Sequence, residues 1–373
     1  MANIFSNLFG NFFGKKDSIV AIDIGSSAIK LVQIRRDHGR MILETYGELS
    51  AGPFGGASVG QAVSLNIDKL TEMLKELIKK ANVTTNQAVF AIPLRSSLLI
   101  NMQIPEIGQK DLDSIISLEA RKYVPVPITE VELDWWKMPE YRSEAINTTE
   151  ADDRPGENFR KIEVMAVAIH KDTLKLYRDL ADKLGLSIGS FEIETFSMVR
   201  SAIHNDLSPT VVVDFGAGTT KVAVMDYGIL RLSHTIGKGS QDLSHAISRS
   251  LEVSFEKAED IKRRLGLIAP ATTEQILGSV SPILEHIFAD INRVIVNYQT
   301  KSRKAVSRIV FTGGGTMLKG FLELAQKNFE MPVEMSAPFE RVEYPQFMAE
   351  ITRKAGPDFA VAIGLAIRKL QDE

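Results

Sequence analysis

Two segments of this 373-residue chain carry the same pattern, and they lie 191 positions apart. The first begins at Ser18 and reads SIVAIDIGSSAIKLVQI, and the second begins at Pro209 and reads PTVVVDFGAGTTKVAVM. Each contains an apolar β-branched run, an acid, a glycine turn and a second apolar run, a pattern that predicts a β-hairpin. We therefore expect two related halves, each opening with an acidic β-hairpin.

Both hairpins carry groups suited to a nucleoside triphosphate. Glycine turns let backbone N–H groups approach a phosphate closely, and neighbouring hydroxyls and lysines add donors. Asp23 and Asp214 occupy corresponding positions and are candidate ligands, through water, of Mg²⁺, which prefers carboxylates, waters and substrate phosphates. A third glycine turn follows a predicted strand, Arg308 to Phe311. The candidate phosphate- and nucleotide-binding residues of the three turns are Gly25, Ser26, Ser27, Lys30, Gly216, Gly218, Thr219, Thr220, Lys221, Gly313, Gly314 and Gly315.

Two other nucleotide motifs fit this sequence poorly. The segment GNFFGKK, from Gly10, has three rather than four residues between its glycines, and Lys16 stands where a P-loop has Ser or Thr. In the second hairpin, Lys221 stands where a dinucleotide-binding fingerprint needs its third glycine. These departures argue against a P-loop protein and against a Rossmann fold.

The composition narrows the classes of function. The chain has 44 Lys and Arg against 47 Asp and Glu, so it lacks the basic excess that nucleic-acid binding requires. The absence of cysteine excludes disulfides, thiol catalysis and cysteine-bound metals, and it fits a reducing cytosol. The longest strongly apolar run, near residues 359–367, is far shorter than the roughly 18 residues of a membrane-spanning helix. We expect a cytoplasmic protein that meets a membrane only peripherally.

The pattern along the chain predicts an α/β protein with an inserted subdomain. That subdomain combines predicted strands with a helix opening at Gln109 and a long exposed loop at about 141–160. The alternative is an elaborated edge of the first lobe. The predicted parts are an apolar N-terminal segment (1–17), a first lobe (18–93 and 169–208), the inserted subdomain (94–168), a second lobe (209–357) with a long helical region from Ser240 to Leu265, and a closing helix packing back on the first lobe (358–373).

The N-terminal segment has apolar residues at a four-residue recurrence, which would form one stripe on a helix. Such a stripe would suit lipid headgroups or a protein partner. The alternative is a frayed terminus or one folded onto its own lobe, because Gly10 and Gly14 weaken a helix. The residues of the stripe are Ile4, Phe5, Leu8, Phe9, Phe12 and Phe13.

The two hairpins resemble the first and second phosphate motifs of the actin, sugar kinase and heat-shock chaperone superfamily. Thr312 to Gly315 resembles its adenosine motif, and Ala360 to Ile367 resembles its second connecting helix. The resemblance implies a two-lobed actin-like ATPase fold, which is a duplicated ribonuclease H-like fold. It also implies that Glu259 and Lys262, in SFEKAEDIKRRLG, contact the ribose, and the alternative for this pair is an ordinary ion pair on a helix surface.

In this superfamily an acid or amide near the first connecting helix orients the water that attacks the γ-phosphate. Glu194 is the matching residue here, and Glu192 is the runner-up. Positioning and electrostatics supply most of the catalysis in phosphoryl transfer, so a slightly misplaced carboxylate leaves a nucleotide binder with little turnover. The resemblance therefore implies a weak ATPase at most.

Within the superfamily, the chain resembles the PilM family of type IV pilus assembly, which is related to FtsA. Three stretches carry this resemblance: FGKKDSIVAIDIGSSAIKLVQI, SLEARKYVPVPITEVELDWW and KDTLKLYRDLADKLGLSIGSFEIETFSMVRSAI. The second stretch resembles the FtsA- and PilM-type inserted subdomain. The resemblance implies binding of ATP with Mg²⁺ and docking of a cytoplasmic N-terminal peptide from an inner-membrane PilN-like protein, in a groove between the first lobe and the inserted subdomain.

The expected function is thus an ATP-binding scaffold of type IV pilus assembly, or of related type II secretion, held at the inner face of the inner membrane through its partners. Other pilus assembly proteins and a second copy of the chain are further expected partners. One alternative is an FtsA-like filament protein of cell division. Another is a small-molecule kinase of the same fold, although no additional Asp-centred motif suggests its substrate pocket.

Overall fold

The structure, a computed structural model, describes residues 17–105, 109–139, 161–203, 206–267 and 273–371. The apolar N-terminal segment therefore lies outside the described residues, except for Asp17, with which the first strand begins. The long loop expected at about 141–160 also lies outside them. Among the described residues, no helix combines the length and the apolar character that crossing a bilayer requires.

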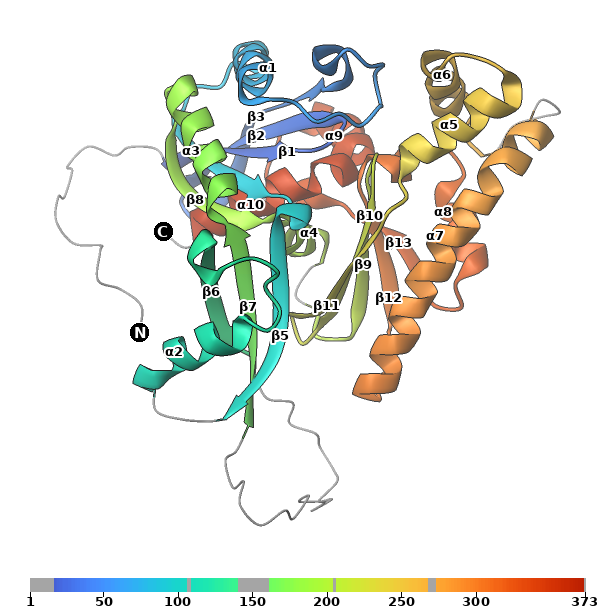
Figure 1. The fold of residues 1–373 in the computed structure, drawn as a ribbon. Coiled ribbons are helices and arrows are strands. Elements are labelled where there is room, and N and C mark those ends of the chain that lie inside the picture. Colours follow the sequence, from blue (N-terminus) through green and yellow to red (C-terminus); the bar gives the residue numbers. More distant parts are fainter. Residues whose placement is uncertain (1–16, 106–108, 140–160, 204–205, 268–272, 372–373) are drawn as a thin grey trace.

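Two five-stranded sheets form the centres of the two lobes (Figure 1). The strand order is β3-β2-β1-β4-β8 in the first sheet and β11-β10-β9-β12-β13 in the second. The strands of the first sheet are β1 (Asp17–Ile24), β2 (Ala28–Asp37), β3 (Arg40–Ser50), β4 (Gln87–Ile92) and β8 (Ser187–Ile193). Those of the second are β9 (Thr210–Phe215), β10 (Thr220–Asp226), β11 (Ile229–Ile236), β12 (Arg308–Thr312) and β13 (Val333–Met335).

The two sheets also have the same strand directions. In each, an antiparallel meander of three strands is followed by two strands parallel to the first strand of the meander. This equivalence is the structural form of the sequence repeat, because β1–β2 and β9–β10 are the two acidic hairpins. The chain is built from two copies of one sheet topology.

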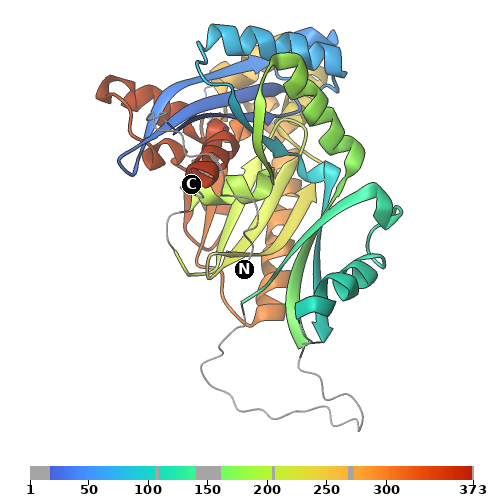
Figure 2. The same ribbon diagram turned by 90° about the vertical axis from the view of Figure 1, so that its left-hand side faces the viewer.

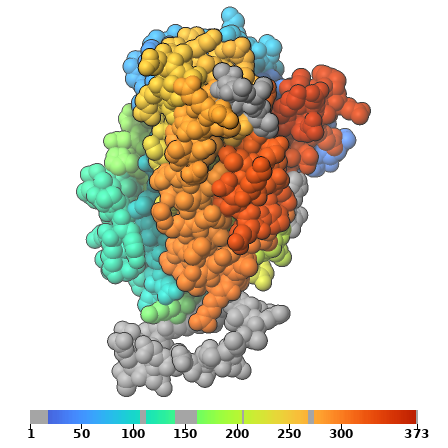
Figure 3. Space-filling view, turned by 90° about the vertical axis from the view of Figure 1, so that its right-hand side faces the viewer, coloured from blue at the N-terminus to red at the C-terminus, as the bar shows by residue number. Residues whose placement is uncertain are grey.

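Helices cover both faces of each sheet. In the first lobe, α1 (Ile67–Lys80) and α3 (Lys171–Leu184) share one core with β1 and β4. In the second lobe, α5 (Ser240–Leu251), α7 (Thr273–Ser302) and α8 (Phe321–Asn328) share another core with β9 and β12. Figure 3 shows α7 running along the outer face of this lobe, with α8 beside it. A further helix of this half, α9 (Ala349–Ala355), precedes the last helix.

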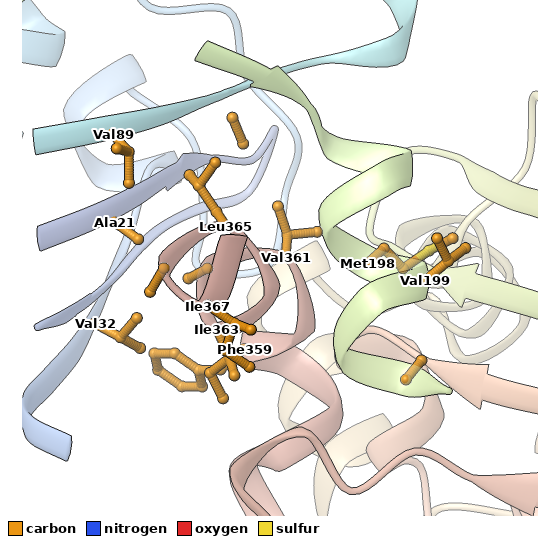
Figure 4. Close-up of a cluster of buried hydrophobic side chains, with 14 of the residues drawn as sticks. Ala21, Val32, Val89, Met198, Val199, Phe359, Val361, Ile363, Leu365 and Ile367 are labelled. Carbon is orange, nitrogen blue, oxygen red and sulfur yellow. The ribbon is translucent and has the colours of Figure 1, made fainter. Parts of the chain in front are cut away.

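Two central helices join the lobes: α4 (Glu194–Ala202) and α10 (Ala360–Gln371). Figure 4 shows α10 between the first sheet, which contributes Ala21, Val32 and Val89, and α4. The other face of α4 packs on β9 and β10 of the second lobe. The helices cross at Gly364, where an added Cβ would lie 1.8 Å from the carbonyl oxygen of Ser197, so only glycine permits this approach.

The inserted subdomain is a three-stranded antiparallel sheet covered by one helix, and it lies below the first lobe in Figure 2. Its elements are β5 (Ser97–Pro105), α2 (Gln109–Ala120), β6 (Val131–Lys137) and β7 (Lys161–His170). The adjacent Trp135 and Trp136 point to opposite faces of β6, as strand geometry predicts. Trp135 donates to Asp113 of α2 (2.8 Å), and Trp136 packs edge-on against Phe196 of α4, with ring centres 5.4 Å apart.

The helical region expected from Ser240 to Leu265 is divided into α5 and α6 (Phe255–Leu265). Glu252 ends α5 in the left-handed conformation, with φ +53°, which an α-helix cannot continue. The side chain of Ser254 then accepts a hydrogen bond from Lys257 N and caps α6. This break turns α6 so that Glu259 and Lys262 line the cleft between the lobes.

Candidate functional site

A cleft of about 480 Å³ lies between the lobes, and the turns of both hairpins line it. The two turns face each other closely, because a Cβ added at Gly218 would lie 3.3 Å from the Ser26 hydroxyl. The third glycine turn, the first turn of α4, and α5 and α6 also line it. The expected site residues that line this cleft are Asp23, Gly25, Ser26, Ser27, Lys30, Glu194, Asp214, Gly216, Gly218, Thr219, Lys221, Glu259, Lys262, Gly313, Gly314 and Gly315.

Thr220 was expected among the phosphate donors, and its position contradicts this. Its side chain is fully buried, and its hydroxyl donates to the carbonyl oxygen of Lys238 (2.8 Å). Successive residues of a strand point to opposite faces, so the Lys221 side chain faces the cleft and that of Thr220 faces away. Thr220 is therefore a structural residue of the hairpin.

The glycines of the third turn are required by close packing. Gly313 has a φ of +88°, and a Cβ there would lie 2.2 Å from Asp214 Oδ1. A Cβ at Gly314 would lie 2.6 Å from Asp358 Oδ1, and one at Gly315 would lie 2.6 Å from the Phe215 carbonyl oxygen. The turn thus fits directly against the carboxylates of the cleft, where a side chain would displace them.

Each hairpin places its acid directly opposite its lysine. Asp23 pairs in register with Lys30, and Asp214 pairs with Lys221. In the second hairpin the Lys221 ammonium lies 3.0 Å from Asp214, whereas in the first the Lys30 ammonium lies 2.5 Å from Asp358, near the start of α10. The two copies therefore have the same backbone and different charge pairs.

Asp358 and Glu48 line the same cleft and were not among the expected site residues. Burial would lower the pKa of Lys30, but the carboxylates of Asp358, Asp23 and Glu48 more than offset this and raise it. Burial also raises the pKa of Glu48, beside Asp358. The sequence showed that Asp358 is an acid at the start of the predicted closing helix, and this signal could have identified it. Nothing in the sequence marks Glu48.

The fold disfavours the ionisation of Asp23. The Asp23 side chain is partly exposed to the cleft, but protein atoms occupy most of the space around it. This burial raises its pKa to about 7, against the opposing effect of Lys30. The neighbouring carboxylates Glu194 and Asp214 raise it further. A cation or an ammonium group placed beside Asp23 would favour its charged form.

Glu194 is held at both carboxylate oxygens. One oxygen lies 2.9 Å from the Lys221 ammonium, and the other accepts the backbone N–H of Leu94 at 2.6 Å. Lys221 is thereby shared between Asp214 and Glu194. Burial would lower the pKa of Lys221, but these two carboxylates raise it well above its ordinary value.

Glu192, the runner-up, does not line the cleft. Both of its oxygens lie 2.7 Å from the guanidinium of Arg200, and one also accepts the Ser197 hydroxyl at 2.5 Å. A second guanidinium, that of Arg368, lies 3.0 Å from one of these oxygens, so donors from three residues surround the carboxylate. Glu192 is a structural residue that joins β8 to α4.

Glu259 and Lys262 form a buried pair rather than a surface one, with 5% and 8% of their surface exposed. The Lys262 ammonium lies 2.7 Å from Glu259, which also accepts from the Ser244 hydroxyl and from Arg263. Burial would raise the pKa of Glu259, but these donors lower it. From the first lobe, Gly60 lines the cleft beside this carboxylate, and a Cβ added at Gly60 would lie 2.6 Å from its carbon, so Glu259 lies where the lobes meet.

Asp23 and Asp214 also have the chemistry of a magnesium site. Across the described ranges, no group of three or more His, Cys, Asp or Glu side chains could hold a metal ion. Mg²⁺ commonly uses one or two carboxylates and takes waters and substrate phosphates as its other ligands. The two aspartates beside the glycine turns fit that type of site.

Solved structures of similar proteins share this architecture. The "PilM-PilN type IV pilus biogenesis complex" contains a chain that is 23% identical, with a TM-score of 0.77, over 94% of this chain and 98% of that chain. EutJ, an ethanolamine utilization protein from Carboxydothermus hydrogenoformans, is 17% identical with a TM-score of 0.52, over 93% and 88%. The chain in a MamK double helical filament is 13% identical with a TM-score of 0.52, over 95% of this chain and 99% of that chain. The expectation of an actin-like ATPase fold is confirmed.

Among curated sequences, the cell division protein FtsA of Neisseria meningitidis is 22% identical over 89% of this chain and 88% of its own length. FtsA of Enterococcus faecalis is 21% identical over 87% and 79%. Residues 21–370 match the family described as type IV pilus assembly protein PilM. The match covers both lobes, the inserted subdomain and nearly all of α10. The chain belongs to the PilM family of type IV pilus assembly proteins.

Proposed function

We propose that this chain is an ATP-binding scaffold of type IV pilus assembly, or of the related type II secretion machinery. The observation that carries the proposal is the cleft in which the glycine turns of both duplicated hairpins face each other. Backbone N–H groups and hydroxyls in such turns suit phosphate oxygens. Membership of the PilM family supports type IV pilus assembly as the cellular process.

In this proposal the two hairpin turns hold the phosphates, and Asp23 and Asp214 hold Mg²⁺ through water. The ion, when bound, neutralises phosphate charge and orients the phosphate chain. Glu259 and Lys262 bind the ribose, and Gly313 to Gly315 approach the adenosine. The buried ion pair of Glu259 supports this role, because its partners fix the carboxylate at the point where the lobes meet.

Hydrolysis is a minor activity in this proposal. Glu194 is the candidate that orients the attacking water, but both of its oxygens already bind protein donors. The bond to the backbone N–H of Leu94 fixes one of these oxygens, and a carboxylate fixed slightly away from the position that the water needs gives slow turnover. Glu194→Gln lowers the rate of phosphate release more than the affinity for ATP, because a water-orienting group acts mainly on the transition state.

The proposed partner is the cytoplasmic N-terminal peptide of a PilN-like inner-membrane protein. Support comes from the solved complex, whose name pairs PilM with PilN. The peptide would dock between the first lobe and the inserted subdomain and would hold the chain, in the cytoplasm, at the inner face of the inner membrane. Other pilus assembly proteins and a second copy of the chain are further proposed partners. The similarity to FtsA favours a division filament as the second candidate function.

Calorimetric titration with Mg-ATP tests the nucleotide site. Asp23→Ala and Asp214→Ala are each expected to weaken binding about tenfold or more, since a charged contact is worth roughly 1.5–3 kcal/mol. Asp182→Ala, an exposed acid of α3 outside the cleft, is the control and leaves the affinity unchanged. If both cleft variants fold and bind like the wild type, the two-hairpin site is wrong. A binding experiment distinguishes the two candidate functions. A role in pilus assembly predicts that the chain captures the PilN-type peptide and does not capture division proteins.

A further inference from the structure

Glu194 connects two parts of the molecule that the sequence keeps far apart. It is the first residue of α4, and only 7% of its surface is exposed. Through Lys221 (2.9 Å) it contacts the second phosphate hairpin. Through the backbone N–H of Leu94 (2.6 Å) it contacts the connection between the first lobe and the inserted subdomain. Among the described residues, no other carboxylate that lines the cleft is hydrogen-bonded to that connection.

Leu94 lies at the entrance to the inserted subdomain. It begins the 3₁₀ turn Leu94–Ser96, which follows β4 after Pro93 and leads directly into β5. The hydroxyl of Ser97 donates back to the Leu94 carbonyl oxygen (3.2 Å), and Ser97 is also the first residue of β5 to pair with β7. The position of the Leu94 backbone therefore sets where β5 leaves the first lobe.

A second contact joins the same turn of α4 to the inserted subdomain. Phe196, two residues after Glu194, packs against Trp136 of β6, with ring centres 5.4 Å apart. Glu194 and Phe196 thus contact both the entrance of the subdomain and its sheet. A shift of the first turn of α4 would be felt at both places, because packed side chains cannot deform independently.

On the nucleotide side, Glu194 contacts Lys221, whose ammonium group a bound phosphate would attract. Its ammonium group binds the carboxylates of Asp214 and Glu194, and it faces the cleft beside the second glycine turn. A phosphate group carries more charge than a carboxylate and offers several strong acceptors. Phosphate in the cleft therefore competes with Glu194 for Lys221.

We propose that Glu194 is a positioning residue that couples occupation of the phosphate site to the conformation of the inserted subdomain. The coupling rests on the proposed nucleotide site and adds a regulatory role to it. Nucleotide draws Lys221 toward phosphate, Glu194 shifts with the first turn of α4, and the Leu94 connection and Trp136 move with it. By linkage, a ligand of the inserted subdomain changes the affinity of the cleft for nucleotide by the same factor.

The backbone contact can be cut without touching the cleft. Leu94→Pro removes the N–H that Glu194 accepts, and proline suits this position because it is the first residue of a helical turn and follows Pro93, whose ψ of 139° tolerates a following proline. Leu94→Ala removes the same side chain and keeps the N–H, so it is the matched control. Glu194→Gln cuts the ionic contact at the other end, with Glu192→Gln, which contacts neither Lys221 nor Leu94, as its control.

The measurement is hydrogen–deuterium exchange of β5, β6 and β7 in the full chain, with and without saturating Mg-ATP. In the wild type and in Leu94→Ala, ATP is expected to change the exchange rates of these strands by about fivefold or more. In Leu94→Pro and Glu194→Gln the change is expected to be lost. The difference made by ATP is the readout, because a purely structural role for Glu194 would alter exchange equally in both conditions.

Calorimetry on the same samples separates this proposal from the proposed function. ATP binding in the wild type without any change in the inserted subdomain overturns the coupling and leaves the nucleotide site intact. An ATP response in Leu94→Pro equal to that in Leu94→Ala also overturns it. Absence of ATP binding overturns both proposals, because the coupling depends on the nucleotide site.

Discussion

The Lys30 ammonium lies 2.5 Å from Asp358 Oδ1, although 328 positions separate the two residues. This pair joins the first phosphate hairpin to the turn before α10, and Asp358 also lies against Gly314 of the third glycine turn. In the second hairpin the corresponding lysine binds Asp214 and Glu194 instead. A ligand in the cleft would therefore meet two lysines whose charges are balanced by different carboxylates.

Asp358→Asn is expected to strengthen ATP binding. The substitution removes a negative charge beside the proposed phosphate site and frees Lys30 from its carboxylate partner. A unit charge at a few ångströms is worth about 1 kcal/mol in water-like surroundings, so the affinity should rise about fivefold at low ionic strength and less at high salt. Isothermal titration at two salt concentrations measures this. A fall in affinity would mean that Asp358 holds Lys30 in its binding position.

Stability is expected to depend on pH through Asp23. Its pKa is about 7 in the folded protein against 3.8 as its ordinary value, so between these pH values the folded state binds more protons than the unfolded state. The contribution of Asp23 to the free energy of unfolding is therefore fully present below pH 4 and falls as pH rises toward 7, by at most about 4 kcal/mol.

Denaturant unfolding of nucleotide-free wild type and Asp23→Asn over this pH range tests the prediction. The free energy of unfolding of the wild type, minus that of Asp23→Asn, should fall as pH rises, because asparagine does not titrate. A constant difference from pH 4 to pH 8 would mean that folding leaves the pKa of Asp23 near its ordinary value.

The approach of Gly60 to Glu259 predicts a second effect on binding. Gly60 has a φ of +84°, and an added Cβ would lie 2.6 Å from the carboxyl carbon of Glu259. Because Ser244, Lys262 and Arg263 hold that carboxylate, it cannot easily move aside. Gly60→Ala should therefore force the lobes apart and weaken ATP binding.

The same loop supplies the control for this prediction. Gly56 also has a positive φ, +72°, but an added Cβ would contact nothing within 4 Å. Both substitutions cost about 1 kcal/mol of backbone strain, while only the one at Gly60 adds the collision. Calorimetry and thermal unfolding of the two variants distinguish them. Equal losses of affinity would show that strain alone is responsible.

Local signals predicted the hairpins and the glycine turns, because a repeated acid, glycine and lysine pattern fixes backbone shape within a few residues. Glu48 and the Lys30–Asp358 pair escaped prediction because they depend on how distant segments pack. Thr220 was misplaced for a different reason. The alternation of strand side chains was available in the sequence, and applying it to Lys221 and Thr220 would have placed their side chains on opposite faces.

The inserted subdomain is expected to bind the PilN-type peptide through exposed apolar residues. Leu118 of α2 and Tyr123, just after α2, are 61% and 50% exposed, and such side chains gain from being covered by an apolar peptide. Leu118→Ser and Tyr123→Ser should each weaken binding of a labelled peptide about fivefold or more, as measured by fluorescence anisotropy, since a buried contact of this kind is worth roughly 1 kcal/mol or more.

The second lobe offers a matched control for this last prediction. Val296 of α7 is 58% exposed, and Val296→Ser makes a similar change of surface far from the proposed groove. This variant should bind the peptide like the wild type, and all three variants should bind Mg-ATP equally. If Val296→Ser weakens the peptide as much as the other two, the effect is a general loss of surface hydrophobicity. If none of the three does so while the wild type captures the peptide, the groove is lined by other residues, and the docking surface must be sought on the first lobe, where Leu176 of α3 is also exposed.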